Sequence, residues 1–137
     1  MQGYNIIMLY SADRTRLLMC RRAKQPYLGL YNLVGGKIEP GEDGADAAYR
    51  ELWEETGVTR ADVELKHVMD FVYHIADCTV QVYAGRLKRD VEPTGDENPL
   101  FWSDLNHNFF DMAQYAGEGN IGHMIEQVNL YREQILD

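Results

Sequence analysis

The stretch GGKIEPGEDGADAAYRELWEETGV, Gly35 to Val58, decides the fold because it contains the clearest helix signal in the chain. Asp43 is of a residue type that caps helix N-termini, and Gly57 is of the type that most often ends helices. Between them, the residues at helical spacing that would pack inward are Ala45, Ala48, Tyr49, Leu52, Trp53 and Thr56. The sequence therefore predicts an amphipathic helix between Asp43 and Gly57.

A second face of this predicted helix carries Glu51, Glu54 and Glu55, at positions i, i+3 and i+4. Like charges at this spacing repel one another by roughly 0.2–0.5 kcal/mol per pair. Arg50 can offset part of this repulsion, because it stands four residues from both Asp46 and Glu54. The acids are either a solvated helix face or the ligands of a hard divalent cation such as Mg²⁺, which prefers oxygen ligands and is often shared with substrate phosphates.

Glycines and acids before the helix extend this pattern into a longer motif. The constrained residues, with the spacings between them, are Gly36, five residues, Glu42, seven residues, Arg50-Glu51-Leu52, one residue, Glu54-Glu55, one residue and Gly57-Val58. This order resembles the Nudix box, G-x5-E-x7-R-E-U-x-E-E-x-G-U with U aliphatic, and every constrained position matches. By this resemblance the chain is identified as a member of the Nudix hydrolase family, of the MutT-like kind.

The rest of the sequence predicts an α+β fold. Apolar and alternating runs predict two hairpins, formed by residues 4–10 with 17–20 and by 63–73 with 79–87, and a short strand at 100–102. A terminal helix capped by Asn120 has one apolar face, made of Ile121, Met124, Ile125, Val128, Tyr131 and Ile135. These elements predict a mixed β-sheet between helices. The resemblance implies the same arrangement, a Nudix-type α/β/α sandwich, in a single domain over residues 1–137 with the box at 36–58.

The resemblance implies a hydrolase in which water attacks a diphosphate group of a nucleoside diphosphate linked to another moiety. It also implies Mg²⁺ or Mn²⁺ as the cofactor, held by the carboxylates of Glu51, Glu54 and Glu55 and by the carbonyl group of Gly35. Such a cation neutralises charge on the phosphate oxygens and lowers the pKa of bound water.

The same resemblance implies catalytic roles for the other polar residues of the box. Arg50 orients the box glutamates by bidentate pairing, and Glu42 supports the site from behind. The base that takes the proton from water is one of the helix acids, Glu51, Glu54 or Glu55, or an acid of the loop at Asp96–Glu97. Apart from the resemblance, Asp96–Glu97 is a pair of charges on a solvent-exposed loop.

Two other segments are candidates for substrate binding. An arginine shortly before the double glycine contacts the substrate phosphates in proteins that this chain resembles, and Arg22 matches that place better than Arg21. From the residues alone, both arginines are the solvated end of a strand. Aromatic and amide side chains in residues 103–119, Asn108 and Phe109 among them, suit stacking on a nucleobase and recognition of its edge. The alternative is that Phe109 belongs to the core.

Composition narrows the class of protein further. The chain has 137 residues, of which 45% are apolar, so it is long and apolar enough to be globular. A net charge of −9 argues against a nucleic-acid polymer as partner, but not against a small nucleotide, because a bound cation reverses the local field. Cys20 and Cys78 lack metal-ligand spacing and are expected to be buried free thiols. Without a signal peptide or an apolar span, we expect a cytoplasmic monomer or homodimer that does not bind membranes.

The function that these observations favour is Mg²⁺-dependent cleavage of a nucleoside triphosphate, of the 8-oxo-dGTP or dNTP kind, to a monophosphate and pyrophosphate. Two alternatives share the chemistry, namely hydrolysis of ADP-ribose and hydrolysis of dinucleoside polyphosphates. Two others do not: a non-catalytic Nudix domain that senses nucleotides, and an isomerase of the isopentenyl-diphosphate type. The complete set of box acids argues against the sensor, and the short chain argues against the isomerase.

Overall fold

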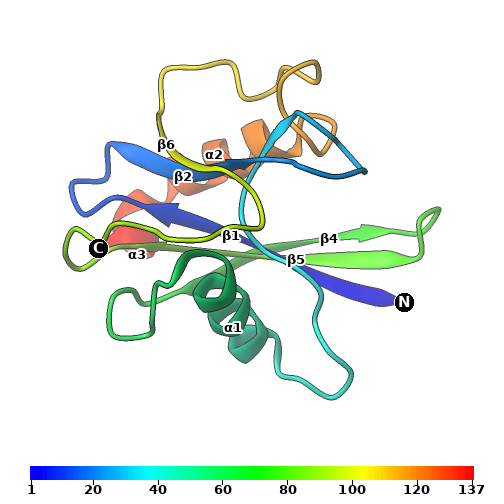
Figure 1. Ribbon diagram of the computed structural model, residues 1–137, viewed down its shortest axis with the longest axis horizontal. Coiled ribbons are helices and arrows are strands. Elements are labelled where there is room, and N and C mark those ends of the chain that lie inside the picture. Colours follow the sequence, from blue (N-terminus) through cyan, green and yellow to red (C-terminus); the bar gives the residue numbers. More distant parts are fainter.

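The computed structural model describes every residue from Met1 to Asp137 and consists of one six-stranded sheet with helices packed on it (Figure 1). In chain order the elements are β1 (Gln2–Tyr10), β2 (Arg16–Arg21), β3 (Tyr31–Asn32), α1 (Gly44–Thr56), β4 (Lys66–Tyr73), β5 (Cys78–Arg86), β6 (Leu100–Asp104), α2 (Asn120–Leu130) and α3 (Arg132–Leu136). None of these helices has the length and apolar character needed to cross a membrane.

The sheet is mixed, as the sequence predicts. Its strand order is β3-β2-β1-β5-β4, and β6 pairs with β2 outside this path. β1 and β5 are parallel along their whole length, and the other pairs are antiparallel. The predicted hairpin of β4 with β5 is confirmed. The predicted hairpin of β1 with β2 is wrong beyond its turn, because the two strands are in register only where Tyr10 faces Leu17, and β2 turns away to pair with β3 and β6.

The segment around the double glycine occupies the edge of β1 that β2 leaves free. The backbone N–H of Asn5 donates to the carbonyl of Gly36 over 2.8 Å, and that of Ile7 donates to the carbonyl of Val34 over 2.9 Å. The carbonyl of Gly3 in turn accepts from the backbone N–H of Ile38. Non-local backbone bonds therefore fix the start of the box beside the centre of the sheet.

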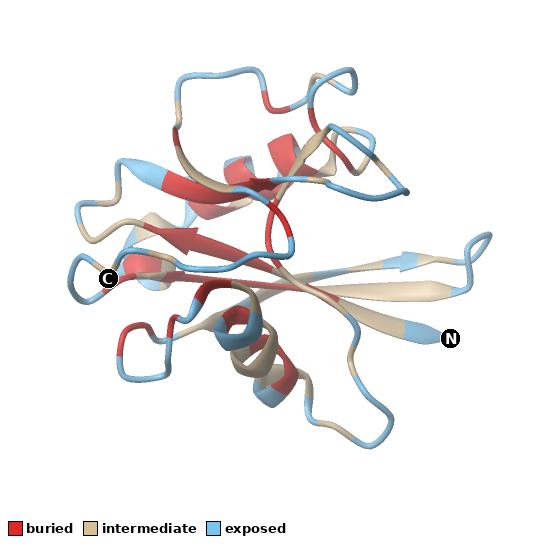
Figure 2. Ribbon diagram, in the orientation of Figure 1, coloured by how far each residue is buried: buried red, intermediate tan, exposed pale blue.

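Alternation along β1 divides the core between two layers of helices (Figure 1). Ile7 and Leu9 pack in one apolar cluster with Leu52 of α1, whereas Met8 and Tyr10 pack in another with residues of α2 and α3. Side chains on a strand point alternately to opposite faces, so one strand supplies both clusters. Figure 2 shows the buried residues gathered on the central strands and on the helix faces turned toward them. This is the α/β/α sandwich that the sequence predicts.

The box helix has the bounds that its capping residues predict. The side chain of Asp43 accepts hydrogen bonds from the backbone N–H groups of Ala45 and Asp46, which would otherwise lack partners at the first turn. Gly57 ends the helix in the left-handed region with φ 76°, and its N–H donates to the carbonyl of Trp53. The predicted apolar stripe is too wide, because Trp53 is 59% exposed.

The C-terminal helix is shorter than the sequence predicts. Asn120 is its first residue, and Gly119 occupies the N-cap position without a side-chain cap. The helix breaks at Tyr131, whose φ of −124° is not helical, and the chain continues as the short α3. Tyr131 is exposed, whereas the other predicted apolar residues up to Val128 are buried. Of the two cysteines, both free, Cys20 is buried as expected and Cys78 is only half-buried.

The loop between β5 and β6 is tied to the C-terminal end of α1. The backbone N–H of Thr94 donates to the carbonyl of Thr56 over 2.8 Å. A Cβ atom on Gly95 would lie 2.0 Å from the carbonyl oxygen of Glu55, so only glycine allows this approach. The contact fixes the part of the loop that carries Glu97.

Replacing Gly95 by alanine is expected to destabilise the protein, because the loop and the helix would have to separate. Overpacking of this kind costs about 1–3 kcal/mol. Urea unfolding measures the change, with Gly3→Ala as the matched control, since a Cβ on Gly3 would meet no atom closer than 3.4 Å. Equal stability of the two variants would contradict the close approach.

Candidate active site

The double glycine brings backbone against the helix carboxylates. The N–H of Gly35 donates to Oε2 of Glu55 over 2.7 Å. A Cβ atom on Gly36 would lie 2.5 Å from the carboxyl carbon of Glu51, so that carboxylate rests on the glycine. Gly35 has a φ of 149°, and a Cβ there would collide with the carbonyl oxygen of Asn5. Both glycines are therefore required by contacts and not only by flexibility.

Glu55 and Glu51 occupy surroundings that disfavour their charged forms. Burial, assisted by the charges of Glu97 and Glu51 and opposed by the Gly35 N–H and by Arg22, raises the pKa of Glu55 to about 7. Burial also raises the pKa of Glu51, against the hydrogen bond and charge of Arg50. The negative charges in this cluster are thus only partly compensated by the protein.

Arg50 links the acids of the box to one another. Its Nε and Nη2 donate to the two carboxylate oxygens of Glu42 over 2.7 and 2.9 Å, a bidentate pair. Its Nη1 donates to Glu51 over 3.1 Å and to Glu54 over 3.2 Å. The hydrogen bond from Arg50 lowers the pKa of Glu42 to about 2. Glu42 is therefore a firmly charged partner that holds the guanidinium group between the loop and the helix.

The donor set of this cluster fits a hard divalent cation. Glu51, Glu54, Glu55 and Glu97 offer only carboxylate oxygens, which Mg²⁺ and Mn²⁺ prefer. The carbonyl groups on either side of Gly35 are bonded to β1, whereas the Gly35 carbonyl has no hydrogen-bond partner. No three His, Cys, Asp or Glu side chains already form a coordination shell. Glu51 and Glu54 contact Arg50, and Glu55 contacts the Gly35 N–H, so the acids would have to turn toward a cation.

A cavity of about 430 Å³ lies beside the cluster and brings together three residues that the sequence predicts as functional. Arg22, Gly35 and Glu55 all line it. Lys37 and Asn98 line it as well, although neither is singled out by the sequence analysis. Lys37 directly follows the double glycine inside the quoted motif, which is a signal that could have identified it. Asn98 reaches the cavity only through tertiary packing, so no local signal points to it.

Other predicted substrate residues lie elsewhere in the structure. Arg21 is exposed at the end of β2, where it faces Tyr31 of β3, and it does not line the cavity. Phe109 is 5% exposed and packs in the core with its ring centroid 5.1 Å from that of Tyr115. Asn108 is exposed, and its side-chain oxygen accepts a bond from the N–H of Phe110. Of the segment from 108 to 115, only Phe109 and Tyr115 are buried in the core, and none of its residues lines the cavity.

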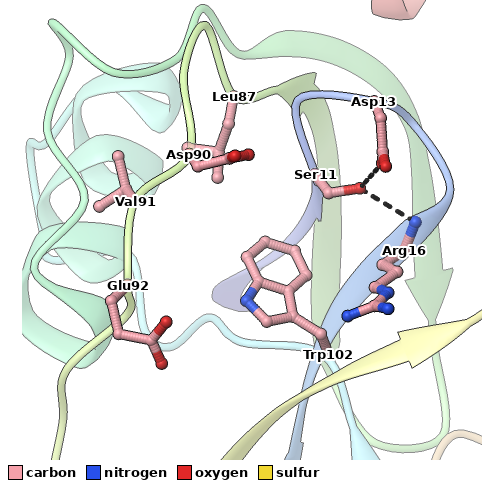
Figure 3. Close-up of a pocket in the computed structure, with 8 residues that line it drawn as sticks. All are labelled: Ser11, Asp13, Arg16, Leu87, Asp90, Val91, Glu92 and Trp102. Carbon is pink, nitrogen blue, oxygen red and sulfur yellow. Dashed lines mark hydrogen bonds between the residues drawn. The ribbon is translucent and has the colours of Figure 1, made fainter.

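A larger cavity, of about 590 Å³, contains none of the box residues (Figure 3). In Figure 3 the Trp102 ring lies between the loop that carries Asp90 and Glu92 and the turn that begins at Ser11 and leads into β2 at Arg16. The carboxylate of Asp13, also in that turn, already accepts hydrogen bonds from Ser11 and Thr15. The larger of the two cavities is therefore not the one that adjoins the acid cluster.

The chain is similar to several known proteins over much of its length. The Nudix hydrolase YvcI of Bacillus subtilis is 28% identical over 120 residues, which are 83% of this chain and 72% of that protein. A second Bacillus subtilis protein, provisionally named an 8-oxo-dGTP diphosphatase, is 38% identical over 60 residues, 44% of this chain and 37% of its own. The crystal structure of a Caenorhabditis elegans Ap4A hydrolase superposes with a TM-score of 0.77 at 17% identity, covering 98% of this chain and 99% of that one.

The resemblance found in the motif is confirmed at the level of the whole sequence. The family model described as NUDIX domain matches residues 1–123, which include every element from β1 to the start of α2. The motif, the sandwich fold and this match together show that the chain belongs to the Nudix hydrolase family.

Proposed function

We propose that this Nudix hydrolase cleaves a nucleoside triphosphate to a monophosphate and pyrophosphate with the help of Mg²⁺ or Mn²⁺. The observation that carries the proposal is that Arg22, Lys37 and Glu55 line one cavity. The positive side chains of Arg22 and Lys37 would bind the phosphate oxygens of a substrate, and a metal ion would bridge those phosphates to the carboxylates. The name of the 38% identical relative supports the triphosphate class for the matched part of the chain.

The two basic side chains are available to a ligand. Within the protein, only the Nε–H of the Arg22 side chain donates a hydrogen bond, to the carbonyl of Pro26 over 3.2 Å, so its terminal N–H groups are unpaired. The Lys37 ammonium group has no ion pair in the protein. Arg22 already acts on the charge of Glu55, because its proximity lowers the pKa of that carboxyl group. Phosphate oxygens would therefore meet positive charge next to the acids.

In the proposed site, Glu51, Glu54, Glu55 and the Gly35 carbonyl hold the cation, which when bound neutralises phosphate charge and lowers the pKa of its water. Arg50 positions Glu51 and Glu54 and is itself held by Glu42. A helix acid, Glu54 or Glu51, takes the proton from the attacking water, and Glu97 is the candidate from the loop. Glu97 is close enough to raise the pKa of both Glu51 and Glu55.

The direct test is a panel of nucleoside triphosphates, ADP-ribose and dinucleoside polyphosphates with Mg²⁺, in which phosphate and pyrophosphate are measured separately. We expect pyrophosphate and a monophosphate from triphosphates, and a loss of kcat by orders of magnitude in Glu55→Gln. Glu126→Gln, at an exposed position on α2, is the matched control. Turnover of only ADP-ribose or dinucleoside polyphosphates would show that nucleoside triphosphates are not the substrates. Tight nucleotide binding without turnover would favour a nucleotide sensor.

Mg²⁺ is also expected to stabilise the folded protein through Glu55. A ligand that binds only the native state adds RT ln(1 + [L]/Kd), about 2.7 kcal/mol at a hundredfold excess over Kd. Thermal unfolding of the wild type and of Glu55→Gln, each with Mg²⁺ and with EDTA, measures this. A Mg²⁺-induced rise in Tm that is equal in both proteins would remove Glu55 from the metal ligands.

Arg22→Ala is expected to lower kcat/KM for every nucleoside triphosphate by a similar factor, because the phosphates are common to all of them. Arg21→Ala is the comparison, since the neighbouring arginine lies outside the cavity. The measurement is kcat/KM for one purine and one pyrimidine triphosphate. A larger loss of kcat/KM in Arg21→Ala than in Arg22→Ala would show that Arg21, and not Arg22, contacts the phosphates.

A further inference from the structure

Asn98 lines the cavity that contains Arg22 and Glu55, and the Nδ2 group of its carboxamide has no hydrogen-bond partner in the protein. The residue is only 9% exposed, and it lines the cavity from the loop between β5 and β6. Its Oδ1 accepts the backbone N–H of Ala23 over 2.9 Å. A backbone N–H can only donate, so this bond fixes which end of the carboxamide is oxygen. The Nδ2 group must point away from Ala23, and no protein acceptor meets it.

The position of Asn98 is held from several sides. The backbone N–H of Arg21 donates to the carbonyl of the next residue, Pro99, over 3.0 Å. On the other side, Gly95 and Thr94 attach the same loop to α1. The backbone is therefore anchored on both sides of Asn98, and the side-chain oxygen of Asn98 is held by the Ala23 N–H. Because a donor held in this way loses little freedom on binding, it can select among ligands.

The chemistry of the lining indicates which part of a nucleotide would meet Asn98. Phosphate oxygens are charged acceptors, and the cavity already offers Arg22 and Lys37 to them. Asn98 Nδ2 is a neutral donor, and the same cavity has apolar walls from Ile6, Leu33 and Val80. A flat nucleobase has apolar faces and neutral acceptors on its edge, so it complements this part of the lining.

We propose that Asn98 is a specificity-determining residue that donates a hydrogen bond from Nδ2 to a ring carbonyl of the substrate's nucleobase. The proposal rests on the proposed function, since it assumes that a nucleotide occupies the cavity. It adds that bases with a carbonyl at the contacted position are preferred over the same bases with an amino group there. An amino group would place donor against donor and leave both unpaired.

Two pairs of nucleotides isolate this contact. Inosine and adenosine nucleotides differ by a carbonyl in place of an amino group on a purine, and uridine and cytidine nucleotides differ likewise on a pyrimidine. Binding of the four monophosphates is measured by calorimetry in EDTA, so the result does not depend on turnover. Within each pair the phosphate is the same, and the ratio of the two Kd values therefore reports the base contact alone.

The decisive variant is Asn98→Asp, which keeps an oxygen to accept the Ala23 N–H and replaces the donor by an acceptor. In the wild type we expect the carbonyl member of at least one pair to bind about tenfold more tightly, the effect of one neutral hydrogen bond. In Asn98→Asp that preference should vanish or invert, whereas Asn129→Asp, at an exposed site on α2, should keep it. Asn98→Leu provides a second variant, in which the preference is lost without inversion.

The outcomes separate this proposal from the proposed function. An unchanged ratio in a folded Asn98→Asp protein, or no preference in the wild type, would overturn the role of Asn98 while triphosphate turnover could still stand. Altered ratios without turnover of any triphosphate would support Asn98 and overturn the proposed reaction. No binding of any monophosphate would overturn the proposal for Asn98.

Discussion

The close approach of the double glycine to both β1 and α1 is the constraint on which the site depends. Backbone bonds from Asn5 and Ile7 attach the segment to the central strand, and the Gly35 N–H reaches Glu55 on the other side. Any side chain on Gly35 or Gly36 would collide with the strand or with Glu51. The sheet, the loop and the helix are thus within contact of one another only because two successive residues have no Cβ atom.

Charge balance around this contact explains why the acidic helix face is tolerated. Arg50 pairs with Glu42, Glu51 and Glu54, which satisfies the more exposed acids. Glu55 lies deeper and is compensated only by a backbone N–H and by the charge of Arg22. The folded chain therefore compensates one half of the cluster internally and leaves the other half to whatever binds there.

Local signals in the sequence were enough to predict the box helix and its ends, because caps such as Asp43 and Gly57 act within one turn. They could not predict the pairing of β1 with β5, since parallel strands meet through long-range contacts. Periodicity placed Trp53 on the apolar stripe, but only the packed structure shows where the covering elements stop. Glu55, which the motif contains, and Arg22, which the family resemblance names, both line one cavity, whereas Asn98 reaches it from a loop without a motif and Phe109 packs in the core.

The attachment of the loop between β5 and β6 to α1 has a consequence for how this loop can change length. Residues 90 to 93 make no hydrogen bond to the rest of the protein, so insertions there would lengthen the part of the loop before this anchor and leave the site alone. Residues between Gly95 and Pro99 connect two anchored points, one on α1 and one on β2. Adding or deleting a single residue in that span would shift Glu97 and Asn98 together. A change in loop length during evolution would therefore displace both the acid near the helix and the amide that lines the cavity.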